Sequence, residues 1–544
     1  MKETIIILGA GVMQGPAIKI AKELRFHTVV LDGSKDAPCI CQADQFVQID
    51  LKDKESIETY ARSLKGKIGI MTAGTDFSAS VAWVAEKLGL PGIPYKTALK
   101  ASDKGLMRAC FSEAGLPSPP FAVISESSFD IPDYLQFPLV IKPVDNMGSR
   151  GCRRVNAKEE FIEAAKSAIG FSRSGKAIAE SYMDGPEFSV DAIVYKGEIT
   201  ICGLADRHIF FPPYFIEMGH TMPTENKEEN AILETFCRGV HALGLANKEN
   251  IGAAKGDIKL TSNGPMIGEI AARLSGGYMS GWTYPYSSGV LPTKAAILAA
   301  MGRKPEGLVP TRKWTCAERA FISIPGKVKQ IIQGNTQVND IFIRIKEGDN
   351  VSFPENNVTK CGNVIASAKN REDAINAAET AAKSFLIRLD PCDTQTRDFL
   401  AKTSNFPPNA FQLTDELKRA LSELEDFTTN QHEHTRRELR NSINVRDSSY
   451  GSWLKSKDDS GSWLKTCYII PFAAFTSSGL KDYMGRTAEE ALEAVRNLTG
   501  FKLPFACENA ENIIRLGRSF WAALIRGSYQ GAVYYIDNLG SNEN

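Results

Sequence analysis

The first 95 residues alternate between short apolar runs and longer segments in which apolar residues recur every three or four positions. The runs TIIILGAG (4–11), HTVVLDG (27–33) and IGIMTAG (68–74) predict buried strands. The segments GPAIKIAKELRF, ESIETYARSLKG and ASVAWVAEKLG predict amphipathic helices. Near-continuous apolar strands that alternate with helices are typical of a parallel sheet covered on both faces. We therefore expect an α/β domain at the N-terminus.

The pattern changes after residue 95. A helical connector ending in the proline-rich LPSPP is followed by hairpin-like strands mixed with helices. A strand-rich stretch then ends in REDAINAAETAAKSFLIRL, whose apolar spacing is helical. From about residue 393 charged helical segments predominate. These shifts predict a multidomain α/β and α+β protein with four units, at residues 1–95, 96–310 (connector 96–125), 311–392 and 393–544.

Composition narrows the class of protein. Lys+Arg and Asp+Glu both number 64 in 544 residues, whereas nucleic-acid binders usually show a basic excess. No apolar run approaches the length that spans a bilayer, and the N-terminal apolar run reaches glycine too soon for a signal peptide. The 11 cysteines are scattered without metal-ligand spacing. We expect a cytoplasmic protein with no nucleic-acid or membrane partner.

The stretch FPLVIKPVDNMGSRGCRRV (137–155) places Lys142 at the end of an apolar strand. A lysine there loses solvation unless an anion meets it. Gly148 and Gly151 would let backbone N–H groups approach a ligand closely. Lysine and glycine loop together suggest a phosphate site. The alternative is a plain hairpin in which the aliphatic part of Lys142 is covered and its ammonium group is in solvent. This stretch by itself does not distinguish a phosphate site from such a hairpin.

A second glycine loop, GAGVMQG, follows the first strand, and Asp32 ends the next strand. This arrangement is similar to a dinucleotide fingerprint. The spacing departs from it, because Gly9, Gly11 and Gly15 give G-x-G-x-x-x-G with Gln14 at the third glycine position. An NAD site would explain residues 1–35 and leave the later motifs without a role.

Two carboxylates lie on strand-like segments joined by the turn TSNGP: Asp257 in GAAKGDIKL and Glu269 in PMIGEIAARLSGG. A hairpin would bring both to one point, as a Mg²⁺ site that bridges phosphates requires. Either carboxylate alone would be read as a solvated strand end. Their combination with two lysines and a glycine loop favours a nucleotide site.

The strand with Lys142, the glycine loop and the two carboxylates, in this order along the chain, resemble the ATP-grasp superfamily of carboxylate–amine or carboxylate–thiol ligases. The likeness covers roughly residues 1–390. The likeness extends to the connector around "DKGLMRACFSEAGLPSPP" and to GDNVSFPENNVTKCGNVIASAKNREDAINAAETA, which is similar to the C-terminal domain of biotin carboxylases and L-amino-acid ligases. No G-x-x-x-x-G-K-S/T sequence is present. The resemblance implies a Rossmann-like domain, an ATP-grasp domain and a strand-rich lid, followed by an extra, mostly helical region.

The resemblance also assigns roles. ATP would be held by Lys104, Lys142, Asn146, Gly148, Ser149, Gly151, Glu180, Ser181, Tyr182, Met183 and Glu187. Asp257 and Glu269 would hold Mg²⁺, or Mn²⁺ in its place. Lys142 and Arg273 would be catalytic, Arg273 by steadying the acyl phosphate or the substrate carboxylate with two donors. Ala271 stands where the family often has a metal-binding asparagine, so a second metal would be held more loosely or by water.

The segment ADRHIFFPPYFIEMGHTMPT (205–224) is similar to one that lies beside the acyl substrate in amino-acid ligases. Glu217 would receive an α-ammonium group, and His220 would contact a carboxylate or act as acid or base near neutral pH. Arg273, Gly276 and Gly277 would complete this substrate site. The aromatic residues of the segment either wall the pocket or form core; these are Phe210, Phe211, Tyr214 and Phe215.

The implied function is an ATP- and Mg²⁺-dependent ligase that activates a carboxylate as an acyl phosphate and joins it to an amine. An amino-acid or small-peptide ligase ranks first, and a biotin carboxylase-like or purine-biosynthesis-like enzyme second. A nucleotide-binding regulatory or scaffold protein is an alternative of another class. It is motivated by residues 393–544, where the pentad GSWLK occurs twice. The expected partners are small-molecule substrates and, as in many relatives, a second copy in a homodimer.

Overall fold

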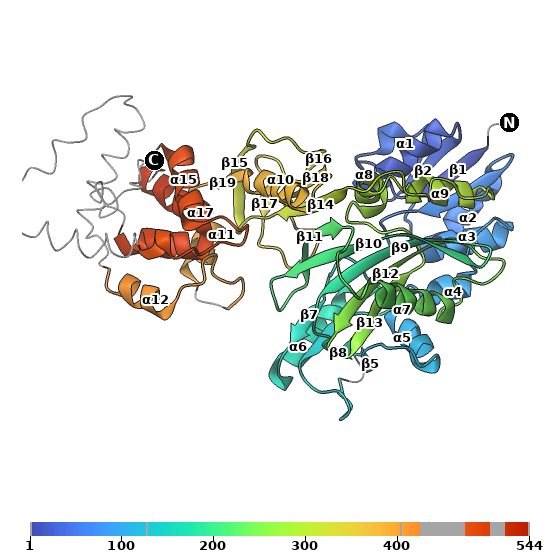
Figure 1. Cartoon of the computed structure of the whole chain (residues 1–544), viewed down its shortest axis with the longest axis horizontal. Helices are drawn as coiled ribbons and strands as arrows, with labels where there is room; N and C mark the ends of the chain where they lie inside the picture. The colour runs from blue at the N-terminus through green and yellow to red at the C-terminus, as the bar shows by residue number, and fades with distance from the viewer. Residues whose placement is uncertain (1–2, 127–128, 403–404, 425–473, 501–516, 542–544) are drawn as a thin grey trace, which may run out of the picture.

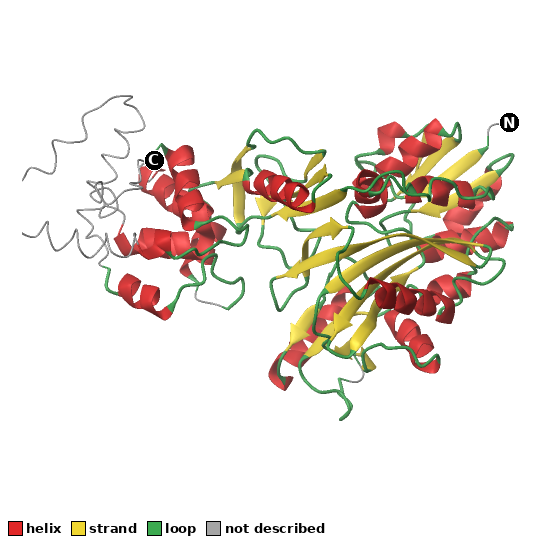
Figure 2. Cartoon of the chain, in the orientation of Figure 1, coloured by secondary structure: helices red, strands yellow, loops and turns green. Residues whose placement is uncertain are grey.

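The computed structural model describes residues 3–126, 129–402, 405–424, 474–500 and 517–541. These residues form an elongated molecule, with the N-terminal sheet at one end and the last helices at the other (Figure 1). Strands form its centre and helices cover them (Figure 2). The mixed α/β and α+β fold predicted from the sequence is confirmed.

The N-terminal unit is a parallel sheet in the order β3-β2-β1-β4. Its strands are β1 (Thr4–Leu8), β2 (His27–Asp32), β3 (Gln45–Gln48) and β4 (Ile68–Thr72). Its helices are α1 (Gly15–Glu23), α2 (Lys54–Ser63) and α3 (Ser78–Leu88), with short 3₁₀ turns at Val12–Gln14 and Ile40–Gln42. Every residue of β1 and β4 is buried, as a sheet covered on both faces requires.

A small antiparallel sheet follows, in the order β5-β8-β6-β7. Its strands are β5 (Phe121–Ser125), β6 (Leu139–Pro143), β7 (Arg153–Val155) and β8 (Lys176–Ser181). Helices α4 (Tyr95–Lys100) and α5 (Lys104–Glu113) precede it, and α6 (Lys158–Phe171) packs on it. The predicted hairpin is confirmed, since Leu139 pairs with Val155 and the glycine loop connects the two strands.

The largest sheet has eight strands in the order β13-β12-β9-β10-β11-β14-β18-β16. Its first five strands in this order are β13 (Gly264–Ala271), β12 (Ile251–Thr261), β9 (Glu187–Tyr195), β10 (Glu198–Phe210) and β11 (Ile216–Met222), with α7 (Glu229–Ala242) against them. The remaining three are β14 (Thr315–Phe321), β18 (Gly362–Ala368) and β16 (Asp340–Ile343). Because β11 pairs with β14, the sheet continues past residue 310, where the sequence predicts a boundary.

The rest of the chain covers the far end of this sheet. A three-stranded sheet of β15 (Gly326–Ile332), β17 (Asn350–Val351) and β19 (Leu386–Leu389) lies beside α10 (Arg371–Lys383). The last helices are α11 (Thr394–Ala401), α12 (Asp415–Ser422), α15 (Ala488–Thr499) and α17 (Gly517–Ser541), and α12, α15 and α17 share one apolar core. Predicted helices at the C-terminus are thus confirmed where the structure describes them. The two GSWLK pentads lie outside the described residues, as does NQHEHTRRELRNSI (430–443), one of the charged segments predicted to be helical after residue 393.

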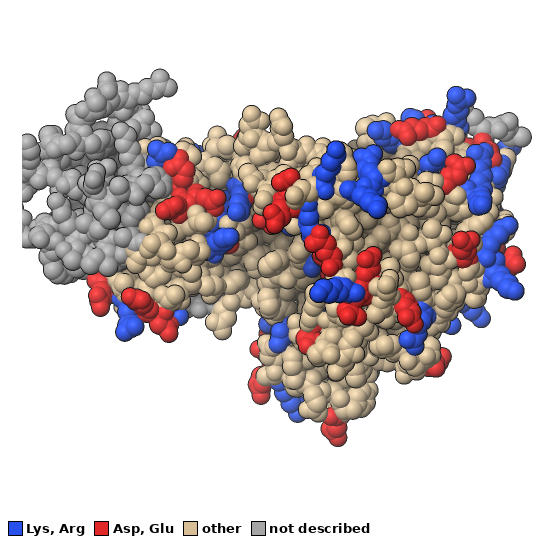
Figure 3. Space-filling model, in the orientation of Figure 1, with Lys and Arg blue, Asp and Glu red and all other residues tan. Residues whose placement is uncertain are grey.

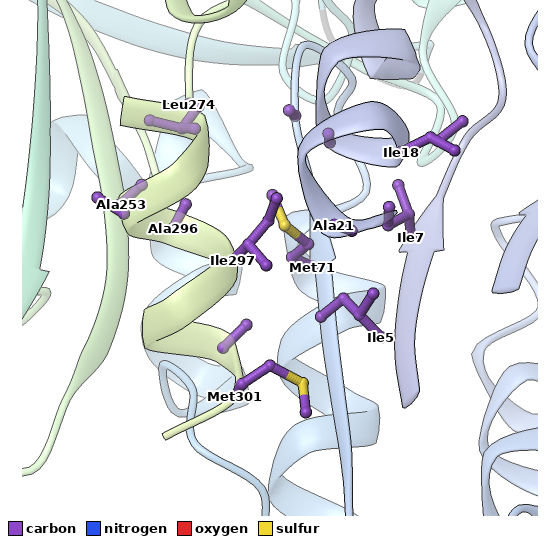
Figure 4. Close-up of a cluster of buried hydrophobic side chains, with 14 of the residues drawn as sticks. Ile5, Ile7, Ile18, Ala21, Met71, Ala253, Leu274, Ala296, Ile297 and Met301 are labelled. Carbon is purple, nitrogen blue, oxygen red and sulfur yellow. The ribbon is translucent and has the colours of Figure 1, made fainter. Parts of the chain in front are cut away.

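One apolar core joins the N-terminal sheet to the rest of the molecule. A π-helical turn at Met279–Thr283, α8 (Tyr284–Ser287) and α9 (Pro292–Ala300) follow β13. Ile297 and Met301, in and just after α9, pack against Ile5 and Met71 of the sheet (Figure 4). All four side chains are buried, and burial of such side chains contributes about 1.5–3 kcal/mol each. The strand ends of the N-terminal sheet are thereby fixed beside the segment after β13.

Charged side chains of both signs are interspersed over the face in Figure 3, in line with the balanced composition. Among the described residues, no helix combines the length and the apolar character needed to cross a membrane.

Candidate active site

A cavity lies between the small sheet and the eight-stranded sheet, beneath the glycine loop. Its walls come from β6, β8, β9, β10, β12 and β13. It brings together most of the residues predicted to hold nucleotide and metal: Lys104, Lys142, Asn146, Gly148, Ser149, Glu180, Ser181, Tyr182, Met183, Glu187, Asp257 and Glu269. Gly151 instead packs against Phe171 with a left-handed backbone, φ 66°.

Lys104 links three elements of this cavity. It begins α5, which Asp103 caps by accepting a hydrogen bond from the Leu106 amide. The Lys104 Nζ donates to the Asn146 carbonyl at 2.9 Å and lies 3.7 Å from the Glu269 carboxylate. A buried ammonium group therefore lies between the glycine loop and β13, where it can meet an anion that enters the cavity.

Lys142 is not a surface lysine. Its Nζ lies 2.7 Å from one Glu180 oxygen, and the Arg108 Nε lies 2.8 Å from the other. Burial would raise the pKa of Glu180, but the charges of Arg108 and Lys142 lower it, so the carboxylate stays ionised. Arg108 and Glu180 are buried, and Lys142 is largely covered. Glu180 lies near the end of β8, and the backbone of Ser181–Met183 continues from it along the cavity wall.

The two predicted metal ligands face each other. Asp257 on β12 pairs directly with Glu269 on β13, which confirms the predicted hairpin. Burial would raise the pKa of Glu269, but Lys104, Lys255 and Lys142 hold it at about 2. Asp257 contacts Lys255 and lies 2.9 Å from Arg207. Two carboxylates on one cavity wall fit Mg²⁺, which takes one or two protein carboxylates and completes its shell with phosphates and water.

No larger metal cluster is found in the described part of the chain, where no three His, Cys, Asp or Glu side chains converge suitably. Ala271 is buried and pairs with Lys255 across the hairpin. The position at which the family resemblance implied an asparagine therefore faces Lys255, whose charge lies next to Asp257.

Arg207 is the main residue that the sequence analysis missed. Its guanidinium contacts Glu187, lies 2.6 Å from Glu217 and lies 2.9 Å from Asp257. These carboxylates raise the pKa of Arg207 well above its ordinary value, despite its burial. Arg207 carries no sequence signal of its own, because it stands between the polar residues Asp206 and His208. Its partners come from three other strands.

The predicted substrate residues Glu217 and His220 lie next to each other on β11. The His220 Nε2 lies 3.4 Å from Glu217, and its Nδ1 lies 3.2 Å from Glu318 on β14. A Cβ at Gly277, whose φ is +60°, would lie 2.9 Å from a Glu217 oxygen and 3.1 Å from the His220 ring. No larger residue fits there without displacing these side chains. The segment after β13 therefore closes tightly on this pair.

These contacts change the predicted roles. Burial would lower the pKa of His220, but Glu217 and Glu318 raise it to about 9. The imidazole is therefore a cation at neutral pH and is not poised to exchange protons there. One Glu217 oxygen is bonded to Arg207 and the other faces Gly277, so only the latter remains to meet an ammonium group.

The His220 cluster predicts a pH dependence of stability. Because the pKa of His220 is higher in the folded state than in the unfolded state, protonation of His220 stabilises the fold. This contribution is complete below the unfolded-state pKa of about 6.5 and disappears as pH rises through about 9. We expect His220→Gln to remove a pH-dependent contribution on the order of 3 kcal/mol at pH 6–7, with little difference from wild type above pH 9. Urea unfolding across this range measures it. The exposed His241→Gln variant is the control, and a pH-independent difference for His220→Gln would contradict the prediction.

Arg273 borders a different, mostly apolar cavity between the N-terminal sheet and β12. Its Nη1 donates to the Leu274 carbonyl at 3.2 Å, and the Gly74 amide donates to the same carbonyl at 3.2 Å. Gly74 and Gly276 are in backbone contact.

Burial raises the pKa of Asp76, which lies within electrostatic range of Arg273, Lys104 and Glu269. Asp76, which the sequence analysis also missed, brings a loop of the N-terminal unit to the site.

The N-terminal glycine loop is filled by the chain's own side chains. The Gln14 amide oxygen accepts from the Gly11 amide at 3.0 Å, and Asp32 accepts from the Ala10 amide at 2.8 Å. A Cβ at Gly9 would lie 3.0 Å from the Gln14 side chain. Gln14 thus takes the place where a dinucleotide pyrophosphate would approach, which disfavours an NAD site.

The aromatic residues of 205–224 divide between the two predicted roles. Phe215 lines the nucleotide cavity. Phe211 and Tyr214 pack as core, Phe211 against Phe353 at 5.1 Å between ring centroids and Tyr214 against Phe406 at 4.8 Å. Phe210 is half exposed at the strand end.

Residues 135–281 match the family model of the ATP-grasp domain. The chain contains an ATP-grasp domain. Residues 320–390 match the L-amino acid ligase C-terminal domain 2, so the resemblance predicted from the sequence is confirmed. The matched ATP-grasp segment contributes nearly all of the cavity, and Lys104 and the N-terminal unit precede it.

Curated relatives and solved structures agree with this family. D-alanine–D-alanine ligase B of Pseudomonas putida is 25% identical over 177 residues, covering 30% of this chain and 54% of the relative. Carnosine synthase 1 of Gallus gallus is 25% identical over 345 residues, covering 57% and 36%. The chain thus spans about half or less of the length of these relatives. The L-amino acid ligase structure from Bacillus licheniformis shares the fold, with TM-score 0.61, 21% identity and coverage of 72% of this chain and 99% of that one.

Proposed function

We propose that this protein is an ATP-dependent ligase that activates a carboxylate as an acyl phosphate and joins it to an amine. The observation that carries the proposal is the cavity beneath the glycine loop, where Lys104 and Lys142 lie opposite Asp257 and Glu269. Cations for phosphate oxygens and carboxylates for a metal thus meet in one place. Relatives that are ligases and the matched ATP-grasp domain support the proposal.

The chain's residues suggest how the reaction proceeds. Lys104 and Lys142 neutralise the phosphates, and the backbone of Gly148 and Ser149 closes over them. Asp257 and Glu269 would hold Mg²⁺, which would supply further neutralisation of phosphate charge. The substrate carboxylate attacks the γ-phosphorus, ADP leaves, and an amine then displaces phosphate from the acyl carbon. Positioning and charge neutralisation carry such a transfer, so no protein nucleophile is needed.

We infer an amino acid or a small peptide as the substrate class. The matched L-amino acid ligase C-terminal domain supports this inference. So does Glu217, whose second oxygen faces Gly277 and is not the one bonded to Arg207. An amino acid carries a complementary ammonium group.

Nucleotide product analysis tests the proposal. The purified chain is incubated with ATP, Mg²⁺ and pools of amino acids, with and without bicarbonate, and ADP, AMP and phosphate are resolved. We expect ADP and phosphate in equal amounts, formed only with certain amino acids and abolished by Glu269→Gln. Dependence on bicarbonate would instead indicate a carboxylase. AMP with pyrophosphate would contradict the acyl-phosphate route, and bound ATP without turnover in any pool would favour a regulatory protein.

A further inference from the structure

A strap of eight residues, FPENNVTK (353–360), runs from β17 toward β18 in the C-terminal unit and passes over the ATP-grasp domain. It contacts both the glycine loop and β11, which are far apart in sequence. The strap therefore lies where the nucleotide side of the site meets the substrate side.

Asn357 makes the contacts on both sides. Its amide donates to the Gly148 carbonyl at 3.0 Å, and its Nδ2 donates to the Ser149 hydroxyl at 3.3 Å. Its Oδ1 accepts a hydrogen bond from the Glu217 amide at 2.8 Å. The pairing of β11 with β14 begins at Gly219, so Glu217 lies beyond it and its amide bonds to the strap. One side chain thus joins the glycine loop to the strand that carries Glu217.

The rest of the strap holds Asn357 in place. Lys360, which is buried, donates to the Glu217 carbonyl at 2.6 Å. Arg344 donates to the Asn357 carbonyl at 3.3 Å and to the Tyr278 hydroxyl at 3.0 Å. The strap is therefore tied to the substrate strand and to the segment after β13 as well as to the glycine loop.

The start of the strap is anchored by the last region of the chain. The Phe353 ring lies 5.1 Å from Tyr483, which precedes α15, and 5.7 Å from Phe406, between ring centroids. Phe353 also packs against Phe211 at the end of β10. Aromatic pairs at this distance stabilise the contact beyond the burial of their surfaces. Residues beyond 393 thus help to fix both the strap and the loop before β11.

We propose that Asn357 is a positioning residue that couples closure of the glycine loop over the nucleotide to the order of the substrate strand at Glu217. The proposal rests on the proposed function. Nucleotide phosphates order the loop at Gly148 and Ser149, the ordered loop holds Asn357, and Asn357 then holds the Glu217 amide. Without the Asn357 side chain, the bonds to the Ser149 hydroxyl and to the Glu217 amide are lost, and only the backbone bond to Gly148 and the Lys360 bond to the Glu217 carbonyl connect the strap to both sides.

Hydrogen exchange with AMP-PNP and Mg²⁺ as the probe tests this coupling and requires no knowledge of the amino-acid substrate. In wild type we expect AMP-PNP to slow exchange both at residues 146–151 and at the Glu217 amide, by about tenfold or more, which corresponds to about 1.4 kcal/mol. In Asn357→Ala the loop should still respond, while exchange at Glu217 becomes independent of AMP-PNP. Thr359→Ala, an exposed change in the same strap that removes only a bond to the Asn356 carbonyl, is the matched control and should behave as wild type.

Two outcomes would overturn the coupling: an Asn357→Ala variant in which AMP-PNP still protects Glu217, or a Thr359→Ala variant that loses the response equally. A general loss of stability would change exchange with and without AMP-PNP alike, and so differs from lost coupling. If AMP-PNP protects neither segment of the wild-type protein, the nucleotide site itself is wrong, and the proposed function fails together with the inference.

Discussion

Replacing Lys142 with methionine is expected to lower ATP turnover by about 10²–10³-fold, the usual cost of removing one charge-stabilising donor from a reaction centre. Lys142 lies inside the cavity, 2.7 Å from Glu180. Methionine retains most of the stem volume but cannot neutralise a phosphate. Turnover at saturating ATP and Mg²⁺, measured as ADP release with the amino acids found by product analysis, gives the result.

Lys176→Met is the matched control, because Lys176 lies on β8 of the same sheet and is exposed. It should keep wild-type turnover. Urea unfolding of both variants separates loss of activity from loss of fold, since Lys142→Met also leaves Glu180 with Arg108 as its remaining cationic partner. A Lys142→Met protein that folds and turns over ATP at the wild-type rate would remove Lys142 from the site.

Replacing Arg207 with methionine is expected to destabilise the protein by about 3–5 kcal/mol at pH 7, the usual cost of leaving buried charge without its partner. Arg207 is the common partner of Glu187, Glu217 and Asp257. Their mutual repulsion in a covered site would replace three favourable contacts. The free energy of unfolding in urea at pH 7 measures the loss.

The effect should shrink as pH falls below about 4.3, the ordinary pKa of a glutamate. Burial would raise the pKa of Glu217, but His220 and Arg207 hold it well below the ordinary value. This depressed pKa stabilises wild type above the unfolded-state value of about 4.3, and the contribution is lost as pH falls. Without Arg207 the carboxylates protonate more readily, which relieves the repulsion. The exposed Arg238→Met variant is the control, and an Arg207→Met loss below about 1 kcal/mol would show that the carboxylates find other partners.

Much of the fold follows from local pattern. The TIIIL and IGIMT runs become the buried strands β1 and β4, because a strand covered on both faces needs apolar residues throughout. The hairpin of Asp257 and Glu269 was predictable because a short turn fixes which residues pair across it. The continuation of one sheet past residue 310 was not, since the pairing of β11 with β14 joins segments about 100 residues apart.

The residues of the candidate site also divide into those that the sequence predicted and those that only the structure revealed. Lys142 and the glycine loop carry sequence signals, because a cation at the end of an apolar strand and closely spaced glycines have few structural explanations. Lys104 was found only through the resemblance of its segment to the ATP-grasp family. Arg108, Arg207 and Asn357 carry none. Each is an ordinary polar residue in its own segment, and its importance depends on carboxylates or backbone groups that other segments bring to it. The predicted role of His220 as an acid or base changed for the same reason, since Glu318 comes from β14.

The sequence by itself determined the order of the elements, the glycine loop, the lysines and the paired carboxylates, because apolar periodicity, turn chemistry and short-range spacing act within a few residues of each position. Only the tertiary structure decided which charges share one cavity, which protonation state His220 holds and how the strap reaches Asn357 across the site. Those properties depend on distances between segments that are remote in sequence, and electrostatic and hydrogen-bond energies are set by such distances and by burial.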